Sequence, residues 1–150
     1  MAFLIDLTDG RFKIPANRAV IEYIRRENPF AHSDVGALLM ALWRRVPGAQ
    51  YYCPSFSSLA YVVLHTPANV IFAIAIGMHK IDFRLPYELV TEAIESGEAE
   101  PSAIGQPGAG SAWLSCRPFS GGEPKALIDT RLKRWCEAAY QWAQESSGGA

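Results

Sequence analysis

The sequence is poor in cysteine and has no long apolar run, and these shortages exclude several kinds of protein. Its three cysteines, at positions 53, 116 and 136, are odd in number and widely spaced. That usage argues for reduced thiols in a cytoplasmic protein rather than for a disulfide framework. The longest nearly continuous apolar run, Val70 to Met78, is too short to cross a bilayer. Asp6 and Asp9 stand where a signal peptide would carry positive charge, so we expect neither export nor membrane insertion.

An excess of charge of one sign is also lacking, because 14 Lys and Arg stand against 15 Asp and Glu. The distribution is uneven: residues 1–50 carry seven basic against five acidic side chains, residues 51–110 two against six, and residues 111–150 five against four. Nucleic-acid binders normally show a dense basic patch and a high pI. The sequence therefore disfavours a DNA-binding role. The basic pairs, which sit beside acids or on solvated helix faces, are Arg25–Arg26, Arg44–Arg45 and Lys133–Arg134.

Local motifs for catalysis and for metal binding are missing as well. His32, His65 and His79 lack the close spacing of ligand sets such as H-x-x-x-H, and there is no G-x-S-x-G element. The glycine-rich stretch 105–111 has Pro107 where a phosphate-binding loop needs an N–H donor, and no lysine follows it. We therefore expect no metal and no cofactor. Residues 98–111 are interpreted as either a connector or a lid over a binding site.

Three apolar runs separated by turn signals predict an antiparallel meander over residues 59–85. The unbroken apolar character of its second strand, 70–76, predicts that both faces of that strand are covered. On its third strand, alternation predicts that Asp82 and Arg84 face outward. A further strand is predicted over residues 112–117, at an edge of the sheet.

The remaining pattern predicts a single α+β domain over 1–150 with helices packed mainly on one face of a central antiparallel sheet. Asp9-Gly10 between alternating runs predicts a β-hairpin over residues 1–15, whereas residues 51–54 are interpreted as an irregular approach to the meander. Residues 146–150 are expected to be a frayed tail. Helices are predicted from a cap at Asn17 to Glu27, from a cap at Ser33 to Val46, from Pro86 to a terminating Gly97, and from Pro124 onward.

From residue 82 onward the chain also resembles known families. The pattern runs Phe83-x-Leu85-Pro86-x-Glu88-Leu89-Val90, Ile94-x-x-Gly97-x-Ala99-Glu100, Trp113-x-Ser115 and Ala138-Ala139-Tyr140. Over residues 82–145 it resembles the small bacterial family called the luciferase domain and, at the level of fold, the MmcQ/YjbR and TfoX N-terminal-like proteins. The resemblance implies a small α+β protein with a central antiparallel sheet. The MmcQ/YjbR likeness also implies DNA binding, which the acidic middle of the chain does not support. Luciferase-domain proteins tend to have a histidine after the Ala-Glu step, where this chain has Pro101-Ser102.

Aromatic side chains gather before the meander, at positions 51, 52, 56 and 61. They either cover a sheet face as core, which is the preferred interpretation, or line a groove for a planar ligand or a partner. Such a groove would lie between the sheet, these aromatics and residues 98–111. The candidate ligand-binding residues are Tyr51, Tyr52, His65, His79, Asp82 and Trp113.

Two functional hypotheses remain in contention. The first is a small cytoplasmic module that binds a small molecule or a protein without catalysis, and whose apolar strands with an exposed edge favour a homodimer. The alternative is a small enzyme with a site assembled from His65, His79, Asp82 and Cys116. That alternative requires at least two of these side chains to meet within hydrogen-bond reach in a concave pocket.

Overall fold

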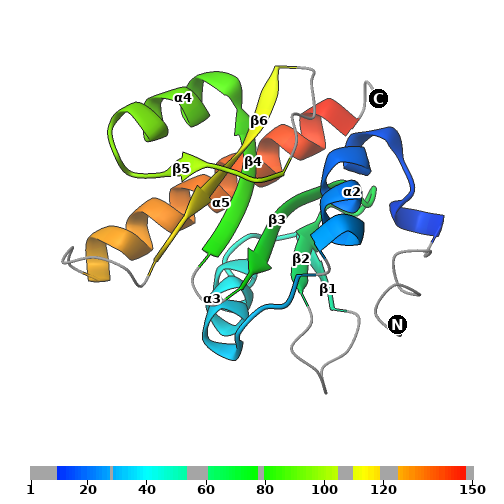
Figure 1. Ribbon diagram of the computed structural model, residues 1–150, viewed down its shortest axis with the longest axis horizontal. Coiled ribbons are helices and arrows are strands. Elements are labelled where there is room, and N and C mark those ends of the chain that lie inside the picture. The colour runs from blue at the N-terminus through cyan, green and yellow to red at the C-terminus, as the bar shows by residue number, and fades with distance from the viewer. Residues whose placement is uncertain are drawn as a thin grey trace.

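An antiparallel sheet forms the centre of the computed structural model, which describes residues 10–27, 29–53, 61–77, 80–104, 110–118 and 125–147 (Figure 1). The predicted α+β class and the meander are confirmed. Across the sheet the strands are β1 (Gln50–Tyr52), β2 (Val62–His65), β3 (Ile71–Ile76), β4 (Lys80–Pro86), β6 (Ser111–Cys116) and β5 (Glu100–Pro101).

Four helices cover this sheet unequally in the described part of the chain. They are α2 (Arg18–Glu27), α3 (Ser33–Trp43), α4 (Tyr87–Glu95) and α5 (Lys125–Ser147). Helices α3, α4 and α5 bury their apolar sides in one core cluster, and α2 buries its own in a second cluster on the opposite face. Figure 1 shows α3 and α5 passing behind the sheet and α2 lying in front of it. The packing of helices mainly on one face is thus as expected. A search of the described helices found none with the length and hydropathy to cross a membrane.

Strand β3 is buried along its whole length because both clusters meet on it. Phe72 and Ala75 belong to the cluster under α3 and α5, whereas Ile74 and Ile76 belong to the cluster under α2. This arrangement confirms that the unbroken apolar run reflects cover on both faces. It also explains why periodicity alone reveals so little about β3, since an alternating pattern appears only where one face is solvated.

The predicted N-terminal hairpin is not formed by the residues that the structure describes. Instead of a return strand, two short 3-10 helices occupy Gly10–Phe12 and Pro15–Asn17, while residues 1–9 lie outside the described residues. Phe12 is buried in the cluster under α2, and Pro15 stands at a helix start, where its missing N–H costs nothing. Packing of Phe12 and the fixed φ of proline therefore outweigh the alternating pattern.

Strand positions differ from the prediction at both sides of the meander. The aromatic approach at Gln50–Tyr52 is a strand, β1, paired with β2. Strand β6 is not at the edge, because the two residues of β5 pair with it from outside. Both edge strands are therefore very short. Short edges of this kind limit pairing with other chains, so they give less support to an edge-to-edge homodimer than the sequence suggested.

Asp82 and Arg84 are buried rather than outward-facing, with only 2% and 4% of their surfaces exposed. They alternate correctly with Ile81, Phe83 and Leu85, which all lie in the cluster under α3, α4 and α5. The prediction failed because it took the opposite face of β4 to be solvated. Alternation reports which face a side chain occupies, and it does not report what covers that face.

The helices begin and end close to the predicted residues. His32, not Ser33, caps α3 by accepting a hydrogen bond from Asp34 N at 3.1 Å. Gly97 follows α4 with a φ of +82°, the left-handed conformation that favours glycine at this position. Helix α5 continues to Ser147, and residues 148–150 of the expected tail lie outside the described residues. Leu132, Trp135 and Ala139, at intervals of three and four residues along α5, are buried.

The side chain of Asn17, which was predicted to cap a helix, forms hydrogen bonds that join the N-terminal segment to the sheet. Its side chain is fully buried. Nδ2 donates to Phe12 O at 3.0 Å and to Asn69 O at 2.8 Å, while Oδ1 accepts from Ile71 N at 2.8 Å. One amide thus satisfies backbone groups of the 3-10 segment, of the turn before β3 and of β3 itself.

Replacing this amide should be costly. Asn17→Ala leaves buried backbone groups without partners, so we expect the free energy of unfolding to fall by about 2–4 kcal/mol. Urea denaturation followed by circular dichroism measures this loss. Gln141→Ala, at an exposed position of α5, is the control and should change the stability by less than about 0.5 kcal/mol. Equal effects of the two substitutions would contradict the fastening role of Asn17.

Candidate functional site

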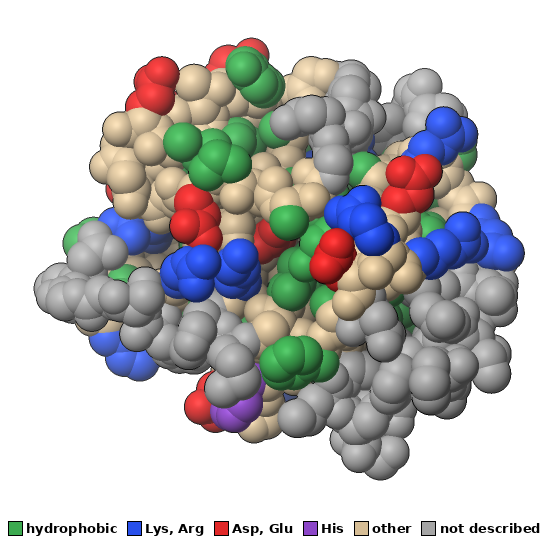
Figure 2. Space-filling model, viewed as in Figure 1, with side chains coloured by type: hydrophobic (Ala, Val, Ile, Leu, Met, Phe, Trp, Pro, Cys, Tyr) green, Lys and Arg blue, Asp and Glu red, His purple; other side chains and the backbone are tan. Residues whose placement is uncertain are grey.

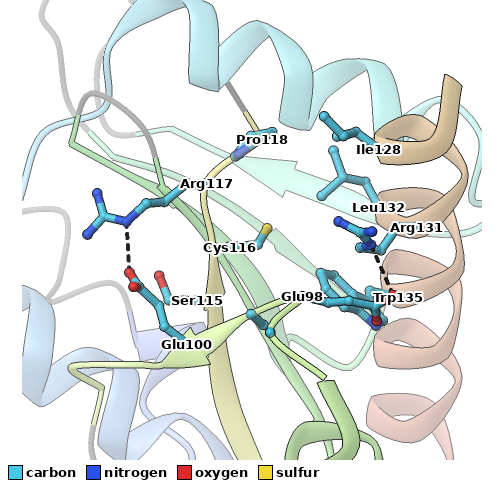
Figure 3. Close-up of a pocket in the computed structure, with 12 residues that line it drawn as sticks. Glu98, Glu100, Ser115, Cys116, Arg117, Pro118, Ile128, Arg131, Leu132 and Trp135 are labelled. Carbon is cyan, nitrogen blue, oxygen red and sulfur yellow. Dashed lines mark hydrogen bonds and ion pairs between the residues drawn. The ribbon is translucent and has the colours of Figure 1, made fainter. Parts of the chain in front are cut away.

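A cleft opens beyond the short strand β5, between the turn that follows α4, the end of β6 and the first half of α5 (Figure 3). Its volume is about 230 Å³, slightly below the range of about 300–1,000 Å³ that is usual for ligand pockets, so it has room only for a small occupant. Residues from three parts of the chain, 97–100, 115–118 and 128–135, line it. Figure 3 shows Ile128, Leu132 and Trp135 on the helix side and Glu100, Ser115 and Arg117 on the sheet side.

Ion pairs hold both sides of this cleft. Arg117 Nε donates to Glu100 Oε1 at 2.9 Å. Arg131 Nε lies 3.5 Å from Glu98 Oε2, and Arg134 Nη2 lies 3.7 Å from the other oxygen of that carboxylate. The Arg131 side chain is 11% exposed, whereas those of Arg117 and Glu100 are more than 40% exposed. The guanidinium groups of Arg117, just after β6, and of Arg131, on α5, both reach the cleft. Each is already paired with a glutamate of the segment that follows α4.

The thiol of Cys116 lies between these two sides. Its Sγ donates to Ile81 O at 3.3 Å. Burial, reinforced by the negative charge of Asp82, raises the pKa of this thiol far above its ordinary value. A cysteine nucleophile needs the opposite shift, toward the thiolate. Cys116 thus contributes a neutral, weakly polar surface to the cleft.

A buried polar cluster adjoins the cleft on the face covered by α2. Asp82 lies opposite Ser115 in the β4–β6 ladder, and Ser115 lies opposite Glu100 in the β5–β6 ladder. Ser102 Oγ donates to Asp82 Oδ2 at 2.5 Å and accepts from Ile104 N at 3.0 Å. Because Glu100 and Ser115 also line the cleft, the cluster and the cleft share a wall.

Burial raises the pKa of Asp82 from 3.8 to about 6. Hydroxyl groups of Ser102 and Ser115 and the charge of Lys80 work against this rise, and the charge of Glu100 adds to it. The Ser115 hydroxyl is near enough to affect the carboxyl. Even so, neither its Oγ nor Asp82 Oδ1 has a partner at hydrogen-bond geometry among the described residues. The carboxyl is therefore only partly compensated for its loss of water.

Arg84, two residues further along β4, has more hydrogen-bond partners to replace the water that it loses on burial. Its Nε donates to Ser111 Oγ at 3.0 Å and its Nη1 donates to Ala16 O at 2.8 Å. Burial lowers the pKa of this guanidinium, which remains charged at neutral pH because an arginine starts so high. Asp82 and Arg84 thus use separate partners, which come from the segment after β5, from β6 and from the second 3-10 helix.

The other predicted ligand-binding residues lie away from the cleft. His65 is buried, its Nδ1–H donates to Thr66 O at 2.8 Å, and its ring packs edge-on against Phe12 at 4.9 Å. Burial lowers the pKa of this imidazole, so it is a neutral core group at neutral pH. Tyr52 contacts Phe12 as well, at 5.1 Å, whereas Tyr51 packs against Trp43 of α3 at 4.9 Å.

Trp113 is buried in the cluster under α2. His79 lies outside the described residues. Among the described members of the predicted enzyme site, His65, Asp82 and Cys116 each bond to other groups and share no hydrogen bond with one another. In the described part of the chain, no set of three His, Cys, Asp or Glu side chains is placed to hold a metal ion.

The basic pairs do not converge on one face either. Arg25–Arg26 belongs to α2, whereas Arg44–Arg45 follows α3 and Lys133–Arg134 belongs to α5, on the opposite side of the sheet. A nucleic-acid backbone needs cations along one continuous surface. This arrangement gives no support to a DNA-binding role.

Comparison with known proteins finds no matching family model, curated protein or solved structure. The residues of the cleft were missed by sequence reasoning, which placed a groove beside the aromatic residues instead. Glu98, Arg117 and Arg131 lie more than ten residues apart in the chain, and no local spacing marks such a set. The only available signal was the position of Glu98 and Glu100 at the start of the 98–111 segment.

The raised pKa of Asp82 has a measurable consequence for stability. Between about pH 4 and pH 6 the folded protein keeps this proton while the unfolded chain releases it, so stability falls as the pH rises. The difference between 3.8 and about 6 corresponds to about 3 kcal/mol. We therefore expect the stability advantage of Asp82→Asn over the wild type to be greater at pH 8 than at pH 4 by about this amount.

Urea denaturation of both proteins at a series of pH values tests this expectation. Glu137→Gln, at an exposed position of α5, is the matched control for removal of a carboxylate. Its difference from the wild type should stay nearly constant over the same range. A constant difference for Asp82→Asn as well would show that the Asp82 carboxyl is solvated.

Proposed function

We propose that this protein is a small, non-catalytic binding module and that the cleft beyond β5 takes a small organic anion with an apolar part. The observation that carries this proposal is the pairing of Arg117 and Arg131, on two walls of one cleft, with glutamates of a single segment. A carboxylate on a ligand can accept charged hydrogen bonds from these two guanidinium groups in place of Glu98 and Glu100. Binding then requires an exchange of partners and no uncompensated burial of charge.

The apolar wall of α5 complements this charge. Ile128, Leu132 and Trp135 line the same cleft, and an aromatic or aliphatic part of a ligand would pack on them. Exposed ion pairs contribute little stability on their own, so the pair between Arg117 and Glu100 opens at low cost. Cys116, whose thiol stays protonated, supports binding rather than nucleophilic attack at this position.

A small enzyme is the second candidate, and Asp82 is the observation in its favour. A carboxyl with a pKa near 6 that touches a serine hydroxyl has the properties of a general acid or base. Its side chain is only 2% exposed, so a substrate would reach it only after Ser102 moved aside. Loss of turnover with retained affinity in Asp82→Asn would favour the enzyme over the binding module.

Benzoate is a suitable probe for the cleft because it combines a carboxylate with a flat apolar ring. In two-dimensional ¹H–¹⁵N spectra we expect benzoate to shift the amide signals of Glu98, Arg117 and Arg131 together with the indole signal of Trp135. Benzamide and benzylamine, which have the same ring without the negative charge, should bind at least about tenfold more weakly, the equivalent of about 1.4 kcal/mol.

Two variants separate binding in the cleft from general attraction of anions. Arg117→Gln should lower the affinity for benzoate by about fivefold to tenfold, because one charged hydrogen-bond donor is lost. Arg45→Gln, at an exposed position beside α3, should leave the affinity unchanged. Equal affinity for benzoate and benzamide, or shifts spread over all exposed arginines, would rule out the proposed site.

A further inference from the structure

A basic groove runs along α2, on the face of the sheet opposite to α5. Lys13, Arg18 and Arg25 line it together with a single acid, Glu22, and its volume is about 390 Å³. Ile14, Pro15 and Ile21 supply its apolar part. All three cations are exposed, and within the described structure none of them has an ion-pair partner.

An acidic stripe with matching features lies on α4. Glu88, Glu92 and Glu95 follow one another at intervals of four and three residues, which places them on one face of the helix. All three are exposed, and the described residues supply no cation to any of them. Tyr87 and Leu89, which are 57% and 37% exposed, stand on either side of the stripe.

The two surfaces complement each other in charge, in spacing and in apolar content. Arg18 and Arg25 are seven residues apart on α2, as are Glu88 and Glu95 on α4. Figure 2 shows acidic side chains over the α4 region at the upper left, and basic side chains with acidic ones among them near α2 at the right, all visible from one side of the molecule. Two copies related by a two-fold axis through that side would therefore bring α4 of each toward α2 of the other.

We propose that the protein forms a two-fold dimer in which the acidic stripe of α4 docks in the basic groove along α2 of a second copy. A nucleic acid fits the groove less well, because Glu22 stands among the three cations and repels phosphates. The α4 stripe brings Tyr87 and Leu89 to the apolar part of the groove. Each contact is made twice in the dimer, so several surface ion pairs that are weak individually add to its stability.

Sedimentation velocity over a range of protein concentrations tests this dimer. At 20 mM NaCl we expect a concentration-dependent shift from monomer to dimer, and at 500 mM NaCl a return to monomer, because salt screens exposed charges. Glu22→Gln removes the one like charge that faces the stripe, and it should tighten the dimer severalfold. Tyr87→Ser and Leu89→Ser together should weaken it without changing the charge.

Charge-reversal variants test whether the two surfaces contact each other. Arg18→Glu/Arg25→Glu and Glu88→Arg/Glu92→Arg each place like charges in both contacts, so each variant alone should stay monomeric. An equimolar mixture of the two should form a one-to-one heterodimer, because every contact then joins opposite charges again. Thermal unfolding by circular dichroism checks that both variants are folded, as expected for exposed positions.

Several results would overturn the dimer. They are a wild-type protein that stays monomeric at 1 mM in low salt, dimerisation that is unaffected by either reversal, and two reversed variants that fail to combine. A fluorescent poly-glutamate peptide or a single-stranded oligonucleotide that binds the groove of a monomeric wild type would likewise overturn it. The groove would then serve an external acidic partner or a nucleic acid.

Discussion

The structure depends on how strand β4 accommodates two ionisable side chains on a covered face of the sheet. Burial of a charge costs several kcal/mol unless polar partners replace the lost water. Arg84 takes these partners from Ser111 and from the backbone of the N-terminal segment, and Asp82 takes Ser102 from the segment after β5. The partners are distant in sequence, so these hydrogen bonds tie β4 to the N-terminal segment, to β6 and to the segment after β5. Strand β6, which supplies Ser111, also contributes Ser115 and Cys116 to the sheet side of the cleft.

Much of the fold was predictable because its elements carry strong local patterns. The meander, α4 and α5 appear close to their predicted positions, since alternation and helical spacing report directly on burial. The prediction of an N-terminal hairpin was wrong for residues 10–15. Phe12 and Pro15 favour short 3-10 helices there, and Phe12 packs under α2. Strand β5 was missed for a different reason: two residues that pair at an edge leave no periodicity to detect.

The candidate site was much less predictable than the fold. Outward positions for Asp82 and Arg84 followed from alternation, but the cover on that face comes from Tyr23 and from loops, which no pattern in β4 records. Aromatic clustering led to Tyr51 and Tyr52, which pack on different neighbours: Tyr52 on Phe12 of the cluster under α2, and the exposed Tyr51 on Trp43. The cleft depends on charged residues that only the folded chain brings together.

Asp82 is a buried carboxyl, held against Ser102 and short of compensating partners. Its titration can be followed by ¹³C detection of side-chain carboxyl signals, with Asp82 assigned by comparison with Asp82→Asn. We expect a midpoint of about pH 6 for this signal. A midpoint at or below pH 4, the range of a solvated Asp, would contradict it.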